Sequence, residues 1–391
     1  MEVVHDNKTT DAGVIPVDWI LCRQEEIVRY INGRAYKLSE WENYGTPVIR
    51  LQNLTGSGET YYYSNLKLPE QQYVNRGDLI FMWSATFGPF IWSGPKAIYH
   101  YHIWKVECRA KVDKLFYYHK LVELTESLKK ETNGSTMLHI TKGEMEKYVL
   151  AIPPTKAEQT AIATALSDTD ALITSLEKLI AKKRNIKQGA MQELLKPRVN
   201  WTLKGIGEIA YVVGGGTPST IISEYWNGDI EWFTPTEIGI SKYVFNSERK
   251  ITKKGLANSS AQILPIGTVL LTSRAGIGDV SILKKTACTN QGFQSLVAKP
   301  STDNEYLYYL VLTLKSTLLQ NASGSTFLEI SPSKVRQIQV HVPPFEEQCE
   351  ISSVLRDMDS EITAIESKLQ KCLTLKQGMM QTLLTGKIRL L

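Results

Sequence analysis

The chain has 391 residues, of which 42% are hydrophobic and 22% are charged, a composition typical of folded globular protein with two or more domains. Its formal net charge of +5 permits a polyanionic partner without requiring one. The five cysteines include no Cys-x-x-Cys pair, which argues against a disulfide framework or a cysteine zinc site and favours a reduced, cytoplasmic compartment. The first ten residues hold no signal-peptide core and no run of eighteen apolar residues occurs, so we expect a soluble protein without a membrane partner.

Residues 1–154 have the pattern of one mixed α/β domain. After a polar leader, short strand-like runs such as 46–54 and 78–82 alternate with turns that contain Gly and Asn. A helical run at 115–129 follows, and then an Asn-Gly-Ser-Thr block that begins at Asn133. We interpret this part as the first domain.

A long helix is expected next, over residues 155–197. Thr155 and Glu158 have the spacing of a capping box, in which both side chains satisfy free amides of the first turn. At 1.5 Å per residue a helix of this length spans roughly 55–60 Å, which is too long to bury its apolar seam against one compact domain. The seam positions, at the three-four spacing of one helix face, are Ile162, Leu166, Ile173, Leu176 and Ile180.

The second half repeats this order, with a domain over 198–343 and a second long helix with a C-terminal tail over 344–391. Gly77 and Gly267 begin corresponding strand-like runs. The helix ends agree best, because seven of ten residues are identical between Ile186-Lys-Gln-Gly-Ala-Met-Gln-Glu-Leu-Leu195 and Leu375-Lys-Gln-Gly-Met-Met-Gln-Thr-Leu-Leu384. The chain is therefore predicted to be a tandem repeat.

The helical periodicity alone would equally fit two unrelated core helices or a homodimeric coiled coil, and the shared helix ends favour duplication. We predict an α+β fold, a tandem duplication of a mixed α/β domain followed by a long helix. The two helices are expected to pack as an antiparallel coiled coil with pseudo-twofold symmetry. Framework glycines and prolines match between the halves, whereas Arg34, Tyr36 and Arg50 have no equivalents, which suggests one scaffold with two different surfaces.

Several motifs are shared with a known family. They are the run 375–387, Gly215-Gly-Thr-Pro-Ser219 followed by Glu224-Tyr-Trp-Asn-Gly-Asp-Ile230, and Ile31-Asn-Gly-Arg-Ala35 with Pro47-Val-Ile-Arg-Leu-Gln-Asn53. With the two Gly-Ser-Thr…Pro-Pro blocks they extend over the whole chain. On these motifs the chain resembles the specificity (S) subunits of type I restriction-modification systems.

This resemblance implies a non-catalytic subunit that binds double-stranded DNA. Each domain would be a target-recognition domain for one half of a bipartite sequence, and the two helices would fix the gap between the halves. The partners implied are two methyltransferase (modification) subunits, which methylate adenine at N6, and restriction endonuclease subunits. No cofactor is expected on this chain, because S-adenosylmethionine, ATP and Mg would bind the partner subunits.

Candidate DNA-binding residues lie in turn-rich segments that supply the side chains with which proteins read bases and phosphates. For any single residue, an ordinary solvated loop position is an equally good interpretation, but the corresponding loops taken as sets favour binding. The strongest candidates are Arg34, Arg50, Trp83, Thr217, Thr236 and Arg274. The full set adds Asn32, Tyr36, Lys37, Gln52, Asn53, Ser84, Thr86, His100, Tyr101, Gly215, Ser219, Ser273, Asn290 and Gln291.

The matching ends of the two helices supply the candidates for binding the methyltransferase subunits. These are Lys187, Gln188, Met191, Leu195, Lys376, Gln377, Met380 and Leu384.

No catalytic or metal site is predicted. Val342 stands where the Asn/Asp-Pro-Pro-Tyr/Phe motif of amino-methyltransferases needs a hydrogen-bonding side chain. The glycine-rich segments 214–216 and 275–278 are not followed by Gly-Lys-Ser/Thr, so a nucleotide-binding P-loop is not expected. The Glu-x-Lys pair at 248–250 has no counterpart in the other half, and the histidines at 100 and 102 lack a third metal ligand.

The sequence leaves two other functions open. One is a self-sufficient DNA methyltransferase or nuclease, which sustained turnover by this chain alone would reveal. The other is a coiled-coil adaptor that binds only protein, which would show no DNA preference at any salt concentration.

Overall fold

The computed structural model describes residues 6–10, 13–58, 60–84, 86–131, 140–274, 276–324 and 328–390. The chain forms two compact units: unit 1 comprises Met1–Lys178 and Ser367–Leu391, and unit 2 comprises Leu179–Glu366. The Gly-Ser-Thr block of the first half, most of that block in the second half, and Ala275 lie outside the described residues.

Unit 1 is built on two four-stranded sheets, with two further two-stranded sheets. Its strands are β1 Asn7–Thr10, β2 Gly13–Pro16, β3 Ile20–Arg23, β4 Val28–Asn32, β5 Thr46–Ile49, β6 Tyr62–Ser64, β7 Tyr73–Val74, β8 Leu79–Met82, β9 Gly88–Ile91, β10 Ala97–Tyr99, β11 Ile103–Cys108 and β12 Val149–Ile152. Its helices are α1 Gln24–Ile27, α2 Leu51–Thr55, α3 Lys114–Glu131 and α4 Lys142–Lys147, with 3-10 turns η1 Leu38–Glu40 and η2 Glu70–Gln72. The strand orders are β4-β11-β8-β9 and β6-β5-β10-β7.

The all-apolar strand β8 is buried on both faces. Successive side chains of a strand point to opposite sides, so Leu79 and Phe81 pack with α3, while Ile80 and Met82 pack toward the second sheet. All but Met82, which is 6% exposed, are fully buried. This is why the run reads as continuously hydrophobic rather than alternating.

Unit 2 has the same construction. Its strands are β13 Thr202–Gly205, β14 Ala210–Gly214, β15 Trp226–Phe233, β16 Tyr243–Val244, β17 Arg249–Ile251, β18 Val269–Leu271, β19 Val280–Leu283, β20 Ala287–Thr289, β21 Gln294–Ala298 and β22 Gln339–Val342. Its short helices are α6 Ile206–Ile209, α7 Lys253–Ala257, α8 Asn304–Thr313, α9 Lys315–Asn321 and α10 Pro332–Gln337, with 3-10 turns η3 Ser223–Tyr225 and η4 Pro235–Glu237. The strand orders are β14-β21-β18-β19-β16 and β17-β15-β20.

The sheets of the two units correspond strand by strand. The order β4-β11-β8-β9 in unit 1 matches β14-β21-β18-β19 in unit 2, and β6-β5-β10 matches β17-β15-β20. In both smaller sheets the central pair is parallel, β5 with β10 and β15 with β20. Only the added edge strands, β7 and β16, join different sheets. The predicted duplication of a mixed domain is confirmed.

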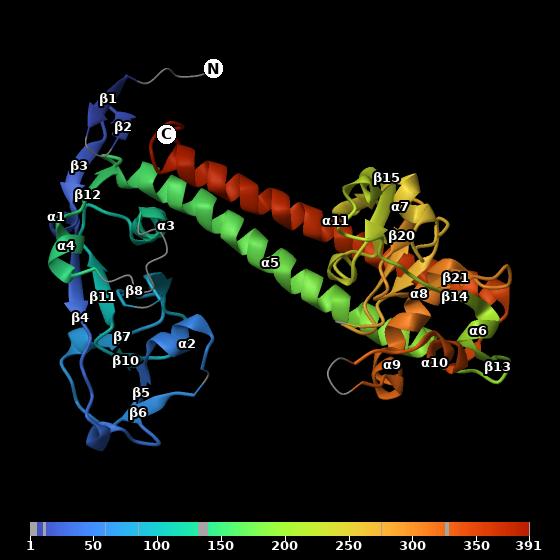
Figure 1. Ribbon diagram of the computed structural model, residues 1–391. Coiled ribbons are helices and arrows are strands. Elements are labelled where there is room, and N and C mark those ends of the chain that lie inside the picture. The colour runs from blue at the N-terminus through green and yellow to red at the C-terminus, as the bar shows by residue number, and fades with distance from the viewer. Residues whose placement is uncertain are drawn as a thin grey trace. The chain divides into compact units, whose positions relative to one another are not determined.

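Two long helices, α5 Lys156–Leu194 and α11 Phe345–Leu383, follow the two domains and are 39 residues each (Figure 1). In unit 1, α5 and α11 approach through the ion pair Asp170–Lys376. In unit 2 the ion pairs Lys183–Glu361 and Lys187–Asp359 join them, and partner numbers fall on α11 as they rise on α5. The helix segments are therefore antiparallel within each unit, as predicted. Among the described residues, no helix combines the length and apolarity needed to cross a membrane.

The start of α5 differs from the expected capping box. The Thr155 hydroxyl accepts a hydrogen bond from the Glu158 amide at 3.3 Å, as predicted. The Glu158 carboxylate does not return to Thr155, because Arg389 near the C-terminus binds it with Nε and Nη2. Arg389 also binds both oxygens of Asp18, at 2.9 and 2.8 Å. The tail thus attaches to the start of the helix and to the entry of the first domain.

We predict that Arg389→Ala destabilises unit 1 by about 3–5 kcal/mol, because it leaves a buried carboxylate without its cation. The side chains of Arg389 and Glu158 are only 4% and 2% exposed. Chemical denaturation measures the loss. In the matched control, Arg198→Ala in unit 2, the arginine is 52% exposed, and Glu347 keeps hydrogen bonds from Asn200 and Trp201. A loss no larger than that of the control would contradict the prediction.

His119 of α3 is buried against α5, where its Nε2 lies 3.1 Å from the Ser167 hydroxyl. Burial lowers the pKa of His119 to about 4. The pKa of the unfolded residue is about 6.5. Between these values the unfolded chain binds a proton that the folded chain does not, so stability is full above the higher pKa and falls as the pH drops through the interval.

We therefore predict that unit 1 loses stability between pH 6.5 and 4, and that His119→Gln flattens part of this dependence. The expected contribution is up to about 3 kcal/mol at the acid end of the interval. Melting temperatures recorded at half-unit pH steps for both proteins give the comparison. Identical pH profiles would show that the pKa of His119 is the same in the folded and unfolded chain, and would contradict the prediction.

Candidate nucleic-acid interface

In each unit a glycine lets one chain segment cross closely over another. A Cβ on Gly33 would lie 2.2 Å from the His100 carbonyl oxygen, and a Cβ on Gly215 would lie 2.0 Å from that of Asn290. The backbone continues the crossing, since the Gly216 amide donates to the Thr289 oxygen at 2.8 Å. These crossings place the loops after β4 and β14 beside the ends of β10 and β20, where the candidate residues gather.

In unit 1 the crossing brings arginines and aromatic rings together. The Arg34 guanidinium lies 5.2 Å from the Tyr36 ring centroid and pairs with Glu40 at 2.6 Å. The Arg50 guanidinium lies 5.5 Å from the Trp41 ring centroid and 5.3 Å from that of Tyr62. The predicted Arg34, Tyr36 and Arg50 therefore share one surface, to which Trp41 and Tyr62 must be added.

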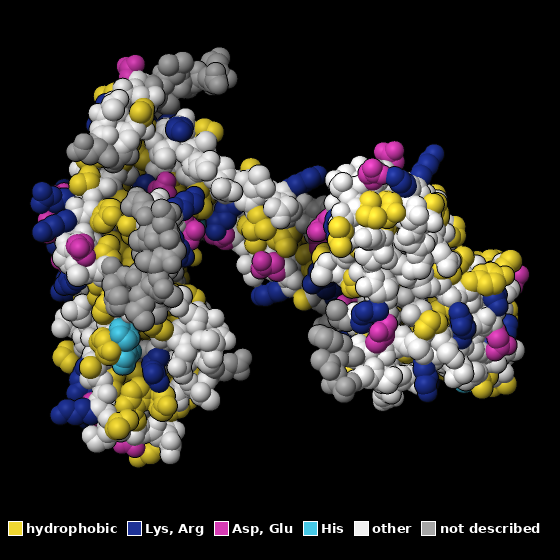
Figure 2. All heavy atoms as spheres, in the orientation of Figure 1, with side chains coloured by type: hydrophobic (Ala, Val, Ile, Leu, Met, Phe, Trp, Pro, Cys, Tyr) yellow, Lys and Arg dark blue, Asp and Glu magenta, His cyan; other side chains and the backbone are white. Residues whose placement is uncertain are grey.

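An aromatic row continues this surface. The rings of His100, Tyr101 and His102 contact one another at tilted angles of 45° and 49°, and the Trp83 indole donates to the Tyr101 carbonyl oxygen at 2.8 Å. Burial lowers the pKa of His100 to about 4, with further lowering by His102 and Arg50, so its ring is neutral at pH 7. A neutral imidazole offers one donor and one acceptor. Figure 2 shows histidine at the surface of unit 1 among hydrophobic and basic side chains.

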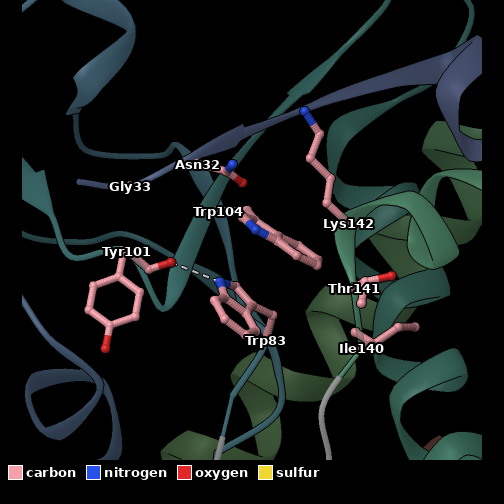
Figure 3. Close-up of a pocket in the computed structure, with 8 residues that line it drawn as sticks. All are labelled: Asn32, Gly33, Trp83, Tyr101, Trp104, Ile140, Thr141 and Lys142. Carbon is pink, nitrogen blue, oxygen red and sulfur yellow. Dashed lines mark hydrogen bonds between the residues drawn. The ribbon is translucent and has the colours of Figure 1, made fainter. Parts of the chain in front are cut away.

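A cavity of about 370 Å³ opens beside this row. Figure 3 shows the Trp83 and Trp104 rings on one side and Lys142 on another, and the two indoles are stacked with centroids 5.8 Å apart. The residues that line it are Asn32, Gly33, Trp83, Tyr101, Trp104, Ile140, Thr141 and Lys142. Three of the candidates, Asn32, Trp83 and Tyr101, thus border one hollow.

The other candidates of unit 1 differ in their exposure and in their contacts within the chain. The Asn53 side chain accepts from the Arg50 amide at 2.9 Å and donates to the carbonyls of Gly58 and Thr60. Gln52 is half-buried on α2, and Ser84 is buried. Lys37 and Thr86 are exposed. We leave Ser84 and Asn53 out of the proposed binding surface.

In unit 2 the loop after β14 is fixed by two tryptophans. The Trp226 indole donates to the Ser219 carbonyl oxygen at 3.1 Å, and the Trp232 indole donates to that of Gly216 at 2.8 Å. The Thr217 hydroxyl bonds to Gln291 across the crossing. Thr217, Ser219 and Gln291 are exposed, so three candidates lie together at the surface.

The remaining candidates of unit 2 divide in the same way. Arg274 pairs with Glu329 at 3.2 Å and donates to the Gln291 carbonyl oxygen at 3.3 Å. Thr236 is exposed, whereas Ser273 is fully buried and cannot reach a ligand in this conformation. Asn290 uses its side-chain oxygen to accept from the Gly292 amide at 2.8 Å. We leave Ser273 and Gly215 out of the side-chain surface, because Gly215 acts by close backbone approach.

Glu231 of β15 is a buried carboxylate with a structural role. Burial alone would raise its pKa, but hydrogen bonds from Lys285, Ser247 and Lys250 lower it to about 2. Lys250, the lysine of the Glu-x-Lys pair, is therefore held 3.0 Å from Glu231. Among the described residues, no group of three or more His, Cys, Asp or Glu is placed to hold a metal ion.

The sequence matches the type I restriction modification DNA specificity domain twice, over residues 16–188 and 198–375. The chain belongs to this family. A type I restriction enzyme MjaVIII specificity subunit of Methanocaldococcus jannaschii is 23% identical over 96% of this chain and 94% of the relative. The EcoBI specificity subunit of Escherichia coli is 22% identical over 95% of this chain and 85% of the relative.

A local match is stronger. The MjaIX specificity subunit of M. jannaschii is 44% identical over 167 residues, which span 42% of this chain and only 39% of that relative. Among solved structures, a type I S subunit from M. genitalium aligns over 96% of this chain and 97% of its own, with 14% identity and a TM-score of 0.62. Another, from work on complex assembly in the type I system, aligns with 14% identity and a TM-score of 0.58. At this identity the two structures show the fold.

The candidate partner-binding residues of this type I specificity chain lie mostly inward. Lys187 and Lys376 form ion pairs between the helices, and Leu384 is fully buried. Met191, Leu195 and Met380 are partly buried and pack on the domain cores. Gln188 and Gln377 face outward. The repeated motif correctly predicted the ends of the two helices. The structure adds which of the motif residues are buried and which are exposed.

We predict that Gly215→Ala disrupts the binding surface of unit 2, because the added methyl group overlaps backbone oxygens that cannot move independently. We expect at least about a tenfold loss of DNA affinity, which corresponds to 1.4 kcal/mol. Fluorescence anisotropy with labelled target DNA measures it. Gly143→Ala is the control, since nothing lies within 4 Å of its Cβ position. Equal affinity for both variants would contradict the assignment.

Proposed function

We propose that each unit reads one half of a split DNA target. The observation that carries this proposal is the combination of one scaffold with different side chains at corresponding places. The crossing glycines and strand orders agree, while His100 corresponds to Asn290 and Tyr101 corresponds to Gln291. A repeated domain that bound the same sequence twice would not need these differences.

The side chains on both surfaces suit DNA. Arginine binds guanine with two hydrogen bonds, asparagine and glutamine bind adenine, and lysine neutralises phosphates. Arg34 and Arg274 already pair with Glu40 and Glu329, so each would exchange a carboxylate for a DNA group on binding. Phosphate contacts release counterions, and affinity should therefore fall steeply as salt is raised.

The outer face of the helix ends supports binding of two identical partners. Gln188, Gly189 and Gln192 are exposed on α5, and the corresponding positions on α11 are Gln377, Gly378 and Gln381, also exposed. Folding alone does not require the exposed residues of the two helices to be identical. Binding of the same partner at both helix ends does require matching surfaces. We propose that this face binds two methyltransferase subunits, which carry S-adenosylmethionine. Restriction endonuclease subunits with ATP and Mg would complete the assembly.

A modification map tests the proposed function. The chain is expressed with a methyltransferase subunit of its own type I system, and N6-methyladenine is located by single-molecule sequencing. A motif split by a fixed gap is the expected result. A single continuous motif would contradict reading by two units, and methylation by this chain alone would contradict a non-catalytic role.

We also propose that α5 and α11 set the gap. Removal of residues 174–180 and 366–372 keeps the ion pairs Asp170–Lys376 and Lys187–Asp359. Seven residues rise roughly 10 Å along a helix, which equals about three base pairs at 3.4 Å each. We predict a gap about three base pairs shorter with unchanged half-sites, measured by the same map. Deletion in α5 alone should instead destabilise the chain, and an unchanged gap in the double deletion would contradict a spacer role.

The helix glycines give a separate prediction for the partner. Glycine inside a helix costs about 0.5–1 kcal/mol relative to alanine. Yet among the described residues, apart from the nearby backbone of the helix itself, nothing lies within 4 Å of a Cβ at Gly189 or Gly378. We predict that Gly378→Ala stabilises the isolated chain by about that amount and weakens methyltransferase binding. Thermal melting and titration calorimetry measure the two effects. Gly143→Ala should leave partner binding unchanged, and unaltered binding by Gly378→Ala would remove this face from the interface.

A further inference from the structure

Arg249 of β17 lies on a platform of two tryptophans in unit 2. Its guanidinium carbon is 3.8 Å from the Trp226 ring centroid and 5.4 Å from that of Trp232. The two indoles meet edge to face with centroids 5.0 Å apart, and they are only 9% and 3% exposed. Arg249 itself is exposed. A planar cation over rigid rings keeps its orientation while its hydrogen-bonding edge stays available.

No carboxylate of the described residues pairs with the Arg249 guanidinium. Among the described residues, the ion pairs and side-chain hydrogen bonds leave the Arg249 side chain without a partner, whereas neighbouring Lys250 pairs with Glu231. Arg274, the arginine that the sequence favoured, is held by Glu329. The five donors of Arg249 are thus free for a ligand.

The platform is built around a β-bulge. β15 bulges against β17 between Trp226 and Ile230, which both align with Ile251. Within the bulge Asn227 has φ 60, the sole positive value among the described non-glycine residues. Asparagine adopts this left-handed backbone more readily than most other non-glycine residues, so it suits this position of the bulge. Here the bulge brings Trp226 next to Trp232.

The same platform holds the loop of candidate residues. The Trp226 indole binds the carbonyl of Ser219 and the Trp232 indole binds that of Gly216. Arg249 therefore packs on the same two rings that hold the loop of Thr217 and Ser219.

Unit 1 has a counterpart made from different strands. Arg50 stacks on Trp41 and Tyr62, and it too has no ion-pair partner among the described residues. In unit 1, Tyr62 of β6 pairs with Val48 of β5. In unit 2, Arg249 of β17 pairs with Trp232 of β15, so the arginine of unit 2 stands on the edge strand that carries a tyrosine in unit 1. One stacked, unpaired guanidinium thus lies at the corresponding sheet in each unit, supplied by a different position. Duplication alone would have copied the position.

We propose that Arg249 is a specificity-determining residue of unit 2 that binds the edge of one guanine in the second half-site, with Trp226 and Trp232 as positioning residues. The proposal rests on the proposed function of reading a split target. The guanidinium fork matches guanine O6 and N7 in the major groove. A fixed orientation favours a base edge over a phosphate, which any mobile cation can bind.

The test uses the full chain with its methyltransferase partner. Modification maps and DNA affinities are compared for wild type, Arg249→Ala, Arg249→Lys and the charge-matched control Lys253→Ala, where the lysine is exposed on α7. We expect both Arg249 variants to accept other bases at one guanine of the second half-site. Affinity for the original target should fall about tenfold to a hundredfold. The first half-site should be unchanged, and Lys253→Ala should keep the wild-type motif.

Each other outcome overturns the assignment. Uniform weakening by Arg249→Ala with wild-type behaviour of Arg249→Lys would mean a phosphate contact. Unchanged maps for both would mean no contact. Trp226→Phe keeps a ring beneath Arg249 and should retain the specificity of the wild type. Trp226→Ala should relax the same single base position as Arg249→Ala. If Trp226→Ala instead loses specificity at both half-sites, Trp226 has a general structural role. A wild-type map without a split motif would instead refute the proposed function itself.

Discussion

The apolar seams of α5 and α11 are too long to be buried by one domain, so each helix buries part of its seam against the other. The arrangement of the repeats along the chain depends on this pairing. A helix of 39 residues has an apolar face far longer than any one domain in this chain can cover. In unit 1 the buried seam residues Ile162 and Leu166 share a core with Leu383 and Leu384 of the other helix. Since each helix also leads out of a domain, antiparallel pairing joins the end of one repeat to the start of the other.

On this frame the two units keep their backbone and change their surface. The close approach of Gly33 and Gly215 to a facing carbonyl is geometric, so a larger residue would displace the loop. The strand positions that carry the stacked arginines have no such requirement for glycine, so their side chains can differ between the units. An arginine can therefore reach the same surface from the end of β5 in one unit and from β17 in the other, provided that aromatic rings lie beneath it. In the proposed recognition, the two units differ at positions where a change of side chain leaves the backbone path unchanged.

Features that depend on residues close together in the sequence could be predicted from it, whereas features that depend on residues far apart in the sequence could not. The helices, their seam and the repeat were predictable because helical periodicity and matching motifs are local. The proposed binding surface follows from the sequence only in part. The platform under Arg249 depends on strand register and on a bulge that brings Trp226 beside Trp232, neither of which is visible in residue spacing. Ser273 and Ser84 were expected at the surface, but both are buried. Glu158 was assigned to a helix cap, but Arg389, more than two hundred residues later, binds it.

The attachment of the C-terminal tail also has a consequence for synthesis on the ribosome. Unit 2 is one continuous segment, Leu179–Glu366, whereas unit 1 combines the first residues of the chain with the last. The buried Leu383 and Leu384 and the Arg389 guanidinium are translated after the whole of unit 2. Domains usually fold in the order in which they emerge. Here the first domain to appear completes its core last, and the middle of the chain is the part that can finish folding while translation continues.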